Sequence, residues 1–162
     1  MPQIKIKEPK TDQWKTIRIT ETQFQSLLDL NTATSKHAKL LSEIEKLNTS
    51  TDIKKFLETV LNFTIDVSNK IIKVGSKIIE IIISVSKHFP KATIGLVVGL
   101  VIGKIISKIP ILGWALNWVI TPLSAIVGVA IGAKNDLEDK DLVKEAEKKI
   151  DTMFAGIKDI KV

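Results

Sequence analysis

A glycine-spaced, uncharged stretch near the middle of the chain constrains the fold more than any other feature. Gly95, Gly99 and Gly103 stand four residues apart in the segment ATIGLVVGLVIG, and Ser107 continues the spacing. Residues four apart share one face of a helix, so small side chains there let a second backbone approach closely. Because a glycine in a water-exposed helix costs about 1 kcal/mol relative to alanine, the repeat indicates close helix packing.

A second uncharged run extends over residues 109–133 and repeats this pattern. Its small residues Ser124, Gly128 and Gly132 are again four apart. The run is longer than the roughly 20 apolar residues that a helix needs to span a bilayer. We therefore expect residues 90–134 to form an apolar helical hairpin of two glycine-zipper helices, at about 92–107 and 112–133, that inserts into a membrane.

Lysine and tryptophan residues flank the two predicted apolar helices. Lysine side chains extend toward water from the end of a membrane helix, and tryptophan concentrates at the membrane–water boundary. The residues expected at the membrane interface are Lys104, Lys108, Trp114 and Trp118 near the turn, with Lys91 and Lys134 at the opposite end. The alternative is a buried core hairpin in a helical bundle, where glycine also permits close packing.

The N-terminal part of the chain is predicted to form a small β-hairpin and short helices. Within residues 1–20, isoleucines alternate with charged residues on both sides of a turn that contains Pro9, which is typical of paired strands. Thr20 and Gln23 have the spacing of a helix-capping box, so short helices are expected over residues 21–50. An isolated hairpin is marginally stable, so we expect this one to pack on a helix or to recruit a partner protein.

Two further segments have the apolar spacing of amphipathic helices. From Ile53 to Val85 apolar residues recur at intervals of three and four, which predicts one long helix over residues 51–89 with a coiled-coil-like seam. Residues 135–162 repeat this spacing from about Asp139. The predicted fold is therefore mainly α: an N-terminal β-hairpin, a helical stalk containing the long amphipathic helix, an apolar helical hairpin and a C-terminal amphipathic helix.

The residues that carry most enzyme chemistry are missing or isolated. The chain has no cysteine, which excludes disulfides, thiolate catalysis and cysteine-bound metals. His37 and His88 have no ligand spacing around them. The sequence GLVIGK lacks the spacing of a phosphate-binding loop. We expect no catalytic residue, no cofactor and no metal site, and hence no enzyme.

The net charge of +6 favours anionic partners such as lipid headgroups or nucleic acid. Nucleic-acid binding is disfavoured because the chain has a single arginine and its tryptophans lie mainly in the apolar region. The segment MPQIKIKEPK has no apolar core of a signal peptide, so synthesis in a cytoplasm is expected. The predicted location is a membrane, reached through the apolar hairpin.

The segments GLVVGLVIG and SAIVGVAIG, with their amphipathic flanks, resemble glycine-zipper membrane proteins and the helical hairpins of α-pore-forming proteins. Colicin-type channel domains and virion proteins ejected into membranes use similar elements. The resemblance covers about residues 90–133. It implies membrane insertion with oligomerisation, and it assigns no further functional residues.

Three functional hypotheses follow from these patterns. The first is a non-enzymatic membrane-active protein whose hairpin inserts into a lipid bilayer and forms a homo-oligomer that acts as a pore or conduit. The second is a soluble structural or assembly subunit, such as a virion or complex component, with the apolar hairpin buried in an oligomer. The third is an inhibitor or immunity-type module with a stoichiometric partner.

Overall fold

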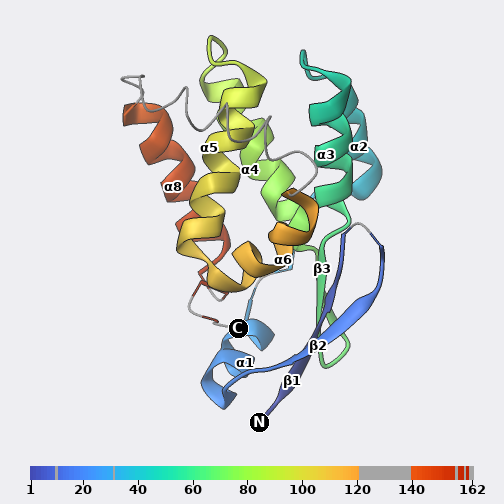
Figure 1. Cartoon of the computed structure of the whole chain (residues 1–162). Helices are drawn as coiled ribbons and strands as arrows, with labels where there is room; N and C mark the ends of the chain where they lie inside the picture. The colour runs from blue at the N-terminus through green and yellow to red at the C-terminus, as the bar shows by residue number, and fades with distance from the viewer. Residues whose placement is uncertain (10, 31, 121–139, 156, 159, 161–162) are drawn as a thin grey trace.

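The computed structural model describes all residues except 10, 31, 121–139, 156, 159 and 161–162 (Figure 1). It is mainly helical with a small antiparallel sheet, as predicted. The elements are β1 (Gln3–Lys7), β2 (Trp14–Arg18), α1 (Glu21–Leu28), α2 (His37–Glu45), α3 (Thr51–Leu61), β3 (Thr64–Val67), β4 (Lys70–Ile72), α4 (Val74–His88), α5 (Ile94–Lys108), α6 (Pro110–Ile120) and α8 (Lys140–Met153). The predicted packing residues Ser124, Gly128 and Gly132, and Lys134, lie outside the described residues.

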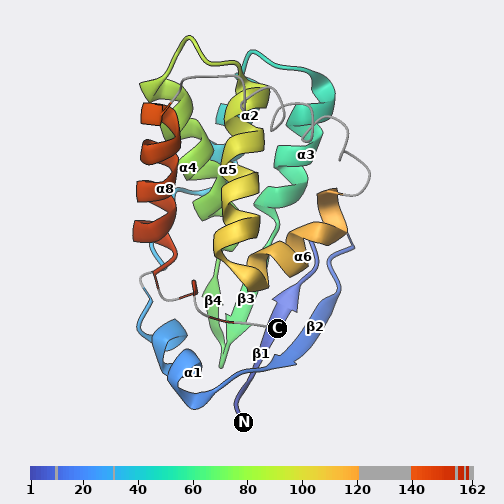
Figure 2. The same cartoon turned by 60° about the vertical axis from the view of Figure 1, so that its left-hand side comes forward.

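The helix bundle and the sheet occupy opposite ends of the molecule, and α1 lies at the sheet end (Figure 1). Helices α2, α3, α4, α5 and α8 form a bundle, and α6 crosses the end of this bundle nearest the sheet (Figures 1 and 2). The strand order is β2-β1-β3-β4, and every neighbouring pair is antiparallel. The predicted N-terminal β-hairpin is confirmed as β1 and β2, and it is one half of a larger sheet.

The prediction of one long helix over residues 51–89 is wrong. Helix α3 ends at Leu61, a short hairpin of β3 and β4 follows, and α4 begins at Val74. The turn of this hairpin contains Ser68 and Asn69, whose φ angles are 52° and 71°. Two consecutive residues with positive φ are typical of the tight turns that join antiparallel strands, and they are incompatible with a continuing helix.

A close approach of two backbones joins α3 to α4. The amide of Gly75 donates a hydrogen bond of 2.9 Å to the carbonyl oxygen of Phe63. A β-carbon added to Gly75 would lie only 2.0 Å from the carbonyl oxygen of Val60. Glycine is therefore required at this position, because a larger residue would overlap the last turn of α3.

The core is formed largely by β-branched and leucine side chains of the central helices. Residues of α4 and α5 such as Ile78, Ile82, Val97 and Ile102 are completely buried. The described part of the apolar segment thus packs inside its own chain, where α5 contacts α4, α6 and α8. The scarcity of charge in this segment, which favoured a lipid environment, is explained in the described part by burial against these helices.

The predicted membrane location is contradicted by the lengths of the helices. Within the described ranges, no helix is both long enough and apolar enough to cross a bilayer. The apolar region is divided at the junction between α5, which ends at Lys108, and α6, which starts at Pro110. Proline fixes φ and lacks an amide hydrogen, so it starts a helix more readily than it continues one.

The residues predicted to lie at a membrane interface have other surroundings in the structure. Lys104 lies 3.1 Å from a carboxylate oxygen of Glu147, and Lys108 lies 3.3 Å from both carboxylate oxygens of Asp151. These contacts link α5 to α8. Trp114 is half-buried against the core, while Lys91 is exposed in the connection between α4 and α5. Trp118 lies in α6.

The ion pairs between α5 and α8 predict an acid-sensitive contribution to stability. A hydrogen bond from Lys104 and the charges of Lys104 and Lys108 lower the pKa of Glu147, although its slight burial opposes the shift. A carboxyl group with a lowered pKa stabilises the fold at neutral pH, and this stability is lost as the pH falls below the ordinary value of 4.5.

We therefore expect Glu147→Gln to reduce the free energy of unfolding at pH 7 by less than about 1 kcal/mol, since water and salt screen such pairs. The difference between the variant and the wild type should shrink as the pH falls below 4.5, toward the lowered pKa of Glu147 in the folded protein. Urea denaturation at several pH values measures both effects. An equal difference at pH 3 and pH 7 would show that the ion pairs contribute nothing.

Candidate protein-interaction surface

The two faces of the sheet differ in what covers them. Side chains of a strand alternate between the faces, so each strand contributes to both. On the inner face Ile4, Ile6, Ile65 and Ile72 are at most 1% exposed. The pairing register places the following residues on the outer face: Gln3, Lys5, Lys7, Trp14, Thr16, Arg18, Thr64, Asp66 and Ile71. We call these nine residues the outer sheet face.

Two large apolar side chains of the outer sheet face are exposed to solvent. Trp14 on β2 is 46% exposed, and Ile71 on β4 is 43% exposed. Among the described residues, the other large apolar side chains in this class are Met1 and Ile106, which lie outside the sheet. An exposed tryptophan is typical of a binding surface when most other large apolar side chains are buried. Tryptophan often provides a large share of the binding energy of a protein interface.

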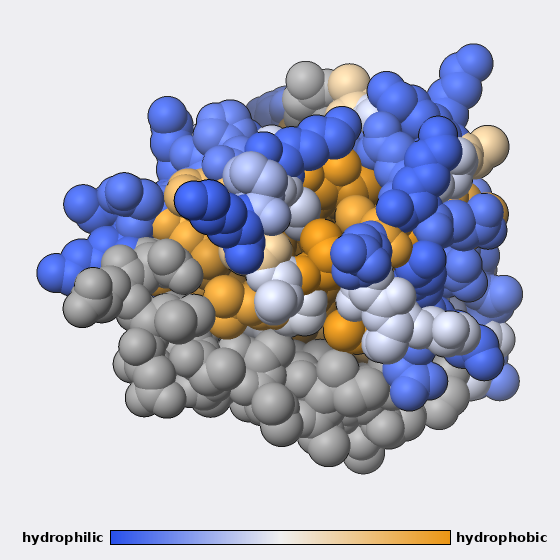
Figure 3. Space-filling model, turned by 90° about the horizontal axis from the view of Figure 1, so that it is seen from above, coloured by the Kyte–Doolittle hydropathy of each residue, from blue (hydrophilic) through white to orange (hydrophobic). Residues whose placement is uncertain are grey.

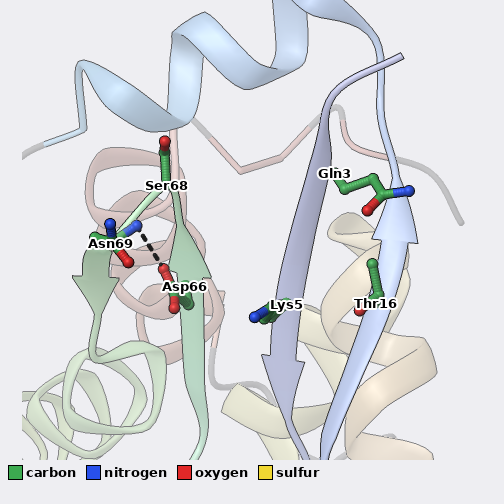
Figure 4. A pocket seen from close by; sticks show the side chains of 6 residues that line it. All are labelled: Gln3, Lys5, Thr16, Asp66, Ser68 and Asn69. Carbon is green, nitrogen blue, oxygen red and sulfur yellow. Dashed lines mark hydrogen bonds between the residues drawn. The ribbon is translucent and has the colours of Figure 1, made fainter.

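A polar hollow of about 200 Å³ lies on the same outer sheet face (Figure 4). It forms where β1 and β3 separate, since their paired residues end at Lys5 and Asp66. Figure 4 shows that its side chains come from β1, β2, β3 and the turn between β3 and β4. The lining residues are Gln3, Lys5, Thr16, Asp66, Ser68 and Asn69.

One wall of the hollow is fixed by the turn between β3 and β4. The carboxylate Oδ1 of Asp66 accepts a hydrogen bond of 2.9 Å from the amide of Asn69 (Figure 4). Ser68 and Asn69 hold their positive φ angles within this turn. The hollow therefore offers a lysine ammonium group on one side and a preorganised carboxylate on the other.

The outer sheet face is predominantly basic. It contains Lys5, Lys7 and Arg18 against the single acid Asp66. Lys7 forms an ion pair of 3.7 Å with Asp12 in the turn between β1 and β2, and this pair is largely exposed to water. Such a surface favours a partner with acidic groups, although charge alone adds more to specificity than to affinity.

The two histidines of the chain lie apart from each other. His37 Nε2 lies 3.4 Å from the side-chain oxygen Oδ1 of Asn62, and His88 lies beside Phe89, so the two histidines contribute to different parts of the surface. Within the part of the chain that the structure describes, no group of His, Asp and Glu residues is arranged to hold a metal ion. The outer sheet face is thus the strongest candidate site in the described residues.

The opposite end of the molecule is a weaker candidate. Figure 3 shows hydrophobic atoms between charged side chains at the end of the helix bundle farthest from the sheet. The connection between α4 and α5 at this end contributes Phe89, Ala92 and Ile94, which are half-buried and pack on the core. These contacts are accounted for by folding alone.

Sequence reasoning found only part of this surface. The alternation around Ile4 and Ile17 predicts the β-hairpin, for which a partner stays a prediction, but it does not single out Trp14. The apolar spacing places Ile71 and Asp66 in a helix, so it does not predict the hollow. The dipeptide Ser68-Asn69 was the available signal, because polar residues of this kind between apolar runs indicate a turn.

No protein-family model matches this chain, and neither a curated protein nor a solved structure matches it. Its function must therefore be argued from the surface itself.

Proposed function

We propose that this protein is a non-enzymatic structural or assembly subunit that binds a partner protein through its outer sheet face. The single observation that carries the proposal is the exposure of two large apolar side chains, Trp14 and Ile71, on a sheet face that also contains a polar hollow. Protein interfaces are enriched in aromatic residues at their centre, and a few such residues provide most of the binding energy.

The surrounding charges support this proposal and define the partner. Lys5 and Arg18 lie on the same face as Trp14, and the register places Lys5 next to Thr16 and Asp66. A partner that places an apolar side chain on Trp14 and a carboxylate near Lys5 would match both the shape and the charge of the face. The fold provides a rigid support, because the inner face of the same strands is buried.

Site-specific photo-crosslinking in cells of the source organism tests the proposal. We expect a crosslinking amino acid at Asp66 to give a discrete adduct, whereas the same amino acid at exposed Lys148 on α8 gives none. Trp14→Ala in the Asp66 background should reduce the adduct yield at least about tenfold, since truncation of an interface tryptophan typically costs more than about 2 kcal/mol. Ile106→Ala on α5 is the matched control and should leave the yield unchanged.

Mass spectrometry of the adduct identifies what was bound. A different protein linked through Asp66 supports the proposal, and its identity gives the assembly to which the chain belongs. The proposal fails if Asp66 gives no adduct, or if Trp14→Ala and Ile106→Ala have the same effect on the yield.

A further inference from the structure

Among the described residues, no strand pairs with the outer edge of strand β2. In an antiparallel pair, residues that exchange hydrogen bonds alternate with residues that do not. The amide of Ile19 donates to the carbonyl oxygen of Pro2 at 3.0 Å, and the amide of Glu8 donates to the carbonyl oxygen of Gln13 at 2.7 Å. These two hydrogen bonds show which residues of β2 exchange backbone hydrogen bonds with β1 and which do not.

This alternation determines which residues of β2 face away from β1. Lys15 and Ile17 direct their backbone groups toward β1, because they lie an even number of residues from Gln13 and Ile19. Trp14, Thr16 and Arg18 therefore direct their amide and carbonyl groups outward. Strand β2 is an end strand of the sheet and lies at its margin in both views (Figures 1 and 2).

The five residues of β2 are complementary to a second copy of themselves. When two copies pair antiparallel about Thr16, Trp14 of each lies opposite Arg18 of the other. All three residues with outward backbone groups then exchange hydrogen bonds in this register, whereas any shift leaves some of them unpaired. Two-fold symmetry of this kind is the commonest arrangement in homo-oligomers.

The side chains agree with the same register. Arginine over the face of a tryptophan is a favourable cation–π contact, and the symmetric pair makes this contact twice. Thr16 meets Thr16 of the second copy, and β-branched residues pack well across strands. Lys15 lies opposite Ile17 of the second copy, so no two like charges are directly opposed.

Charged residues on an end strand usually prevent such pairing. Here the charge of Lys15 has a partner within its own chain, because its ammonium group lies 3.9 Å from a carboxylate oxygen of Glu8. Arg18 is exposed and on the outer face, where the register gives it Trp14 of the second copy. The two cations on β2 therefore do not oppose association in this register.

We infer that two copies of this chain associate through β2 and join their four-stranded sheets into one continuous sheet. The inference goes beyond the proposed function, because it concerns the edge of β2 and does not require another protein on the outer sheet face. The partner at this edge is a second copy of the chain. It fits because, when the two strands pair with Thr16 at the centre, Trp14 of each copy lies opposite Arg18 of the other.

Sedimentation equilibrium of the whole chain tests the inference. We expect the wild type to approach twice its mass of 17.9 kDa at concentrations of tens of micromolar. Thr16→Pro removes the outward amide at the centre of the pair while leaving the hydrogen bonds to β1 intact, since proline is tolerated at the free side of an end strand. Its dissociation constant should be at least about 30-fold higher. Thr16→Val keeps the amide and should behave like the wild type.

A single cysteine provides a second readout that does not depend on tolerance of proline. The chain has no cysteine, so a disulfide in a single-cysteine variant must join two copies. Hydrogen-bonded residues across an antiparallel pair have α-carbons about 5.5 Å apart, within the range of a disulfide. We expect Thr16→Cys to form a linked dimer under mild oxidation, and Lys5→Cys, on neighbouring β1, to form at least about tenfold less.

Two results would overturn the inference. The first is a wild-type mass of 17.9 kDa at every concentration up to the solubility limit. The second is equal disulfide yield from Thr16→Cys and Lys5→Cys. Either result leaves the proposed function intact if photo-crosslinking at Asp66 captures a different protein, so the two ideas fail separately.

Discussion

Gly75→Ala is expected to lower the free energy of unfolding by about 3 kcal/mol or more, although it adds a single methyl group. The added β-carbon would lie 2.0 Å from the carbonyl oxygen of Val60 and 2.7 Å from the carbonyl carbon of Leu61. Both are backbone atoms at the end of α3, so no side-chain rotation relieves the overlap. The two helices would have to separate, and the hydrogen bond from Gly75 to Phe63 would be lost with them.

Gly95→Ala is the matched control, because Gly95 also lies near the start of a helix. Its added β-carbon would meet only the tip of the Ile53 side chain, at 3.4 Å. Alanine should therefore be neutral there or should stabilise α5 by up to about 1 kcal/mol. Chemical denaturation of both variants gives the comparison. Equal and small effects would mean that α3 and α4 approach less closely than described.

Lys77→Met is expected to raise the free energy of unfolding at pH 7 by about 1 kcal/mol at most, because the surroundings of Lys77 on balance disfavour its charged form. Lys77 is in α4 and only 4% exposed. Burial lowers the pKa of Lys77 because a charged ammonium group is poorly solvated there, although the carboxylate of Glu80 acts in the opposite direction. Methionine has a similar length and shape without the charge, so it should occupy the same space.

The pH dependence of this difference gives the sharper test. The unfolded chain binds the Lys77 proton more tightly than the folded protein, so wild-type stability gains from this residue as the pH rises toward 10.5. The advantage of the methionine variant should therefore shrink between pH 7 and pH 10.5. Lys144→Met, at an exposed position of α8, should change stability by less than about 0.5 kcal/mol at either pH. A destabilised Lys77→Met variant would show that the contacts of the ammonium group outweigh its burial.

Sequence patterns predict correctly those elements that are stabilised by residues close together in the chain. The β-hairpin of β1 and β2 follows from strict alternation, and the capping box of Thr20 and Gln23 is present at the start of α1 with both of its hydrogen bonds. These features depend only on residues close together in the chain. They were therefore readable without knowing what packs against them.

The second hairpin could not be predicted in the same way. Spacing of three and four residues over 60–74 fits a helix, yet β3 is held as a strand by pairing with β1, through partners such as Lys5 and Asp66. Tertiary contacts of this kind override local preference. The hollow and three of the nine residues of the outer sheet face depend on β3 and β4, so local spacing does not predict them either.

The glycine pattern does not single out Gly75, where two backbones approach closely. Regular spacing drew attention to Gly95, Gly99 and Gly103, whereas Gly75 is single and lies in an apolar run. Its role depends on the close passage of α3 and α4, which spacing does not reveal. The predicted packing of the glycine stripe against residues 124–132 stays a prediction, because those residues lie outside the described part.

The pairing of β1 with β3 has a consequence for synthesis on the ribosome. Strand β1 is central in the finished sheet, but it is made first, and its partner β3 emerges only after α1, α2 and α3. Until then the N-terminal hairpin has an open side facing the space that β3 will fill, and a two-stranded hairpin is marginal alone. The last step in closing the sheet thus waits for a distant part of the chain, and such non-local contacts make folding slow.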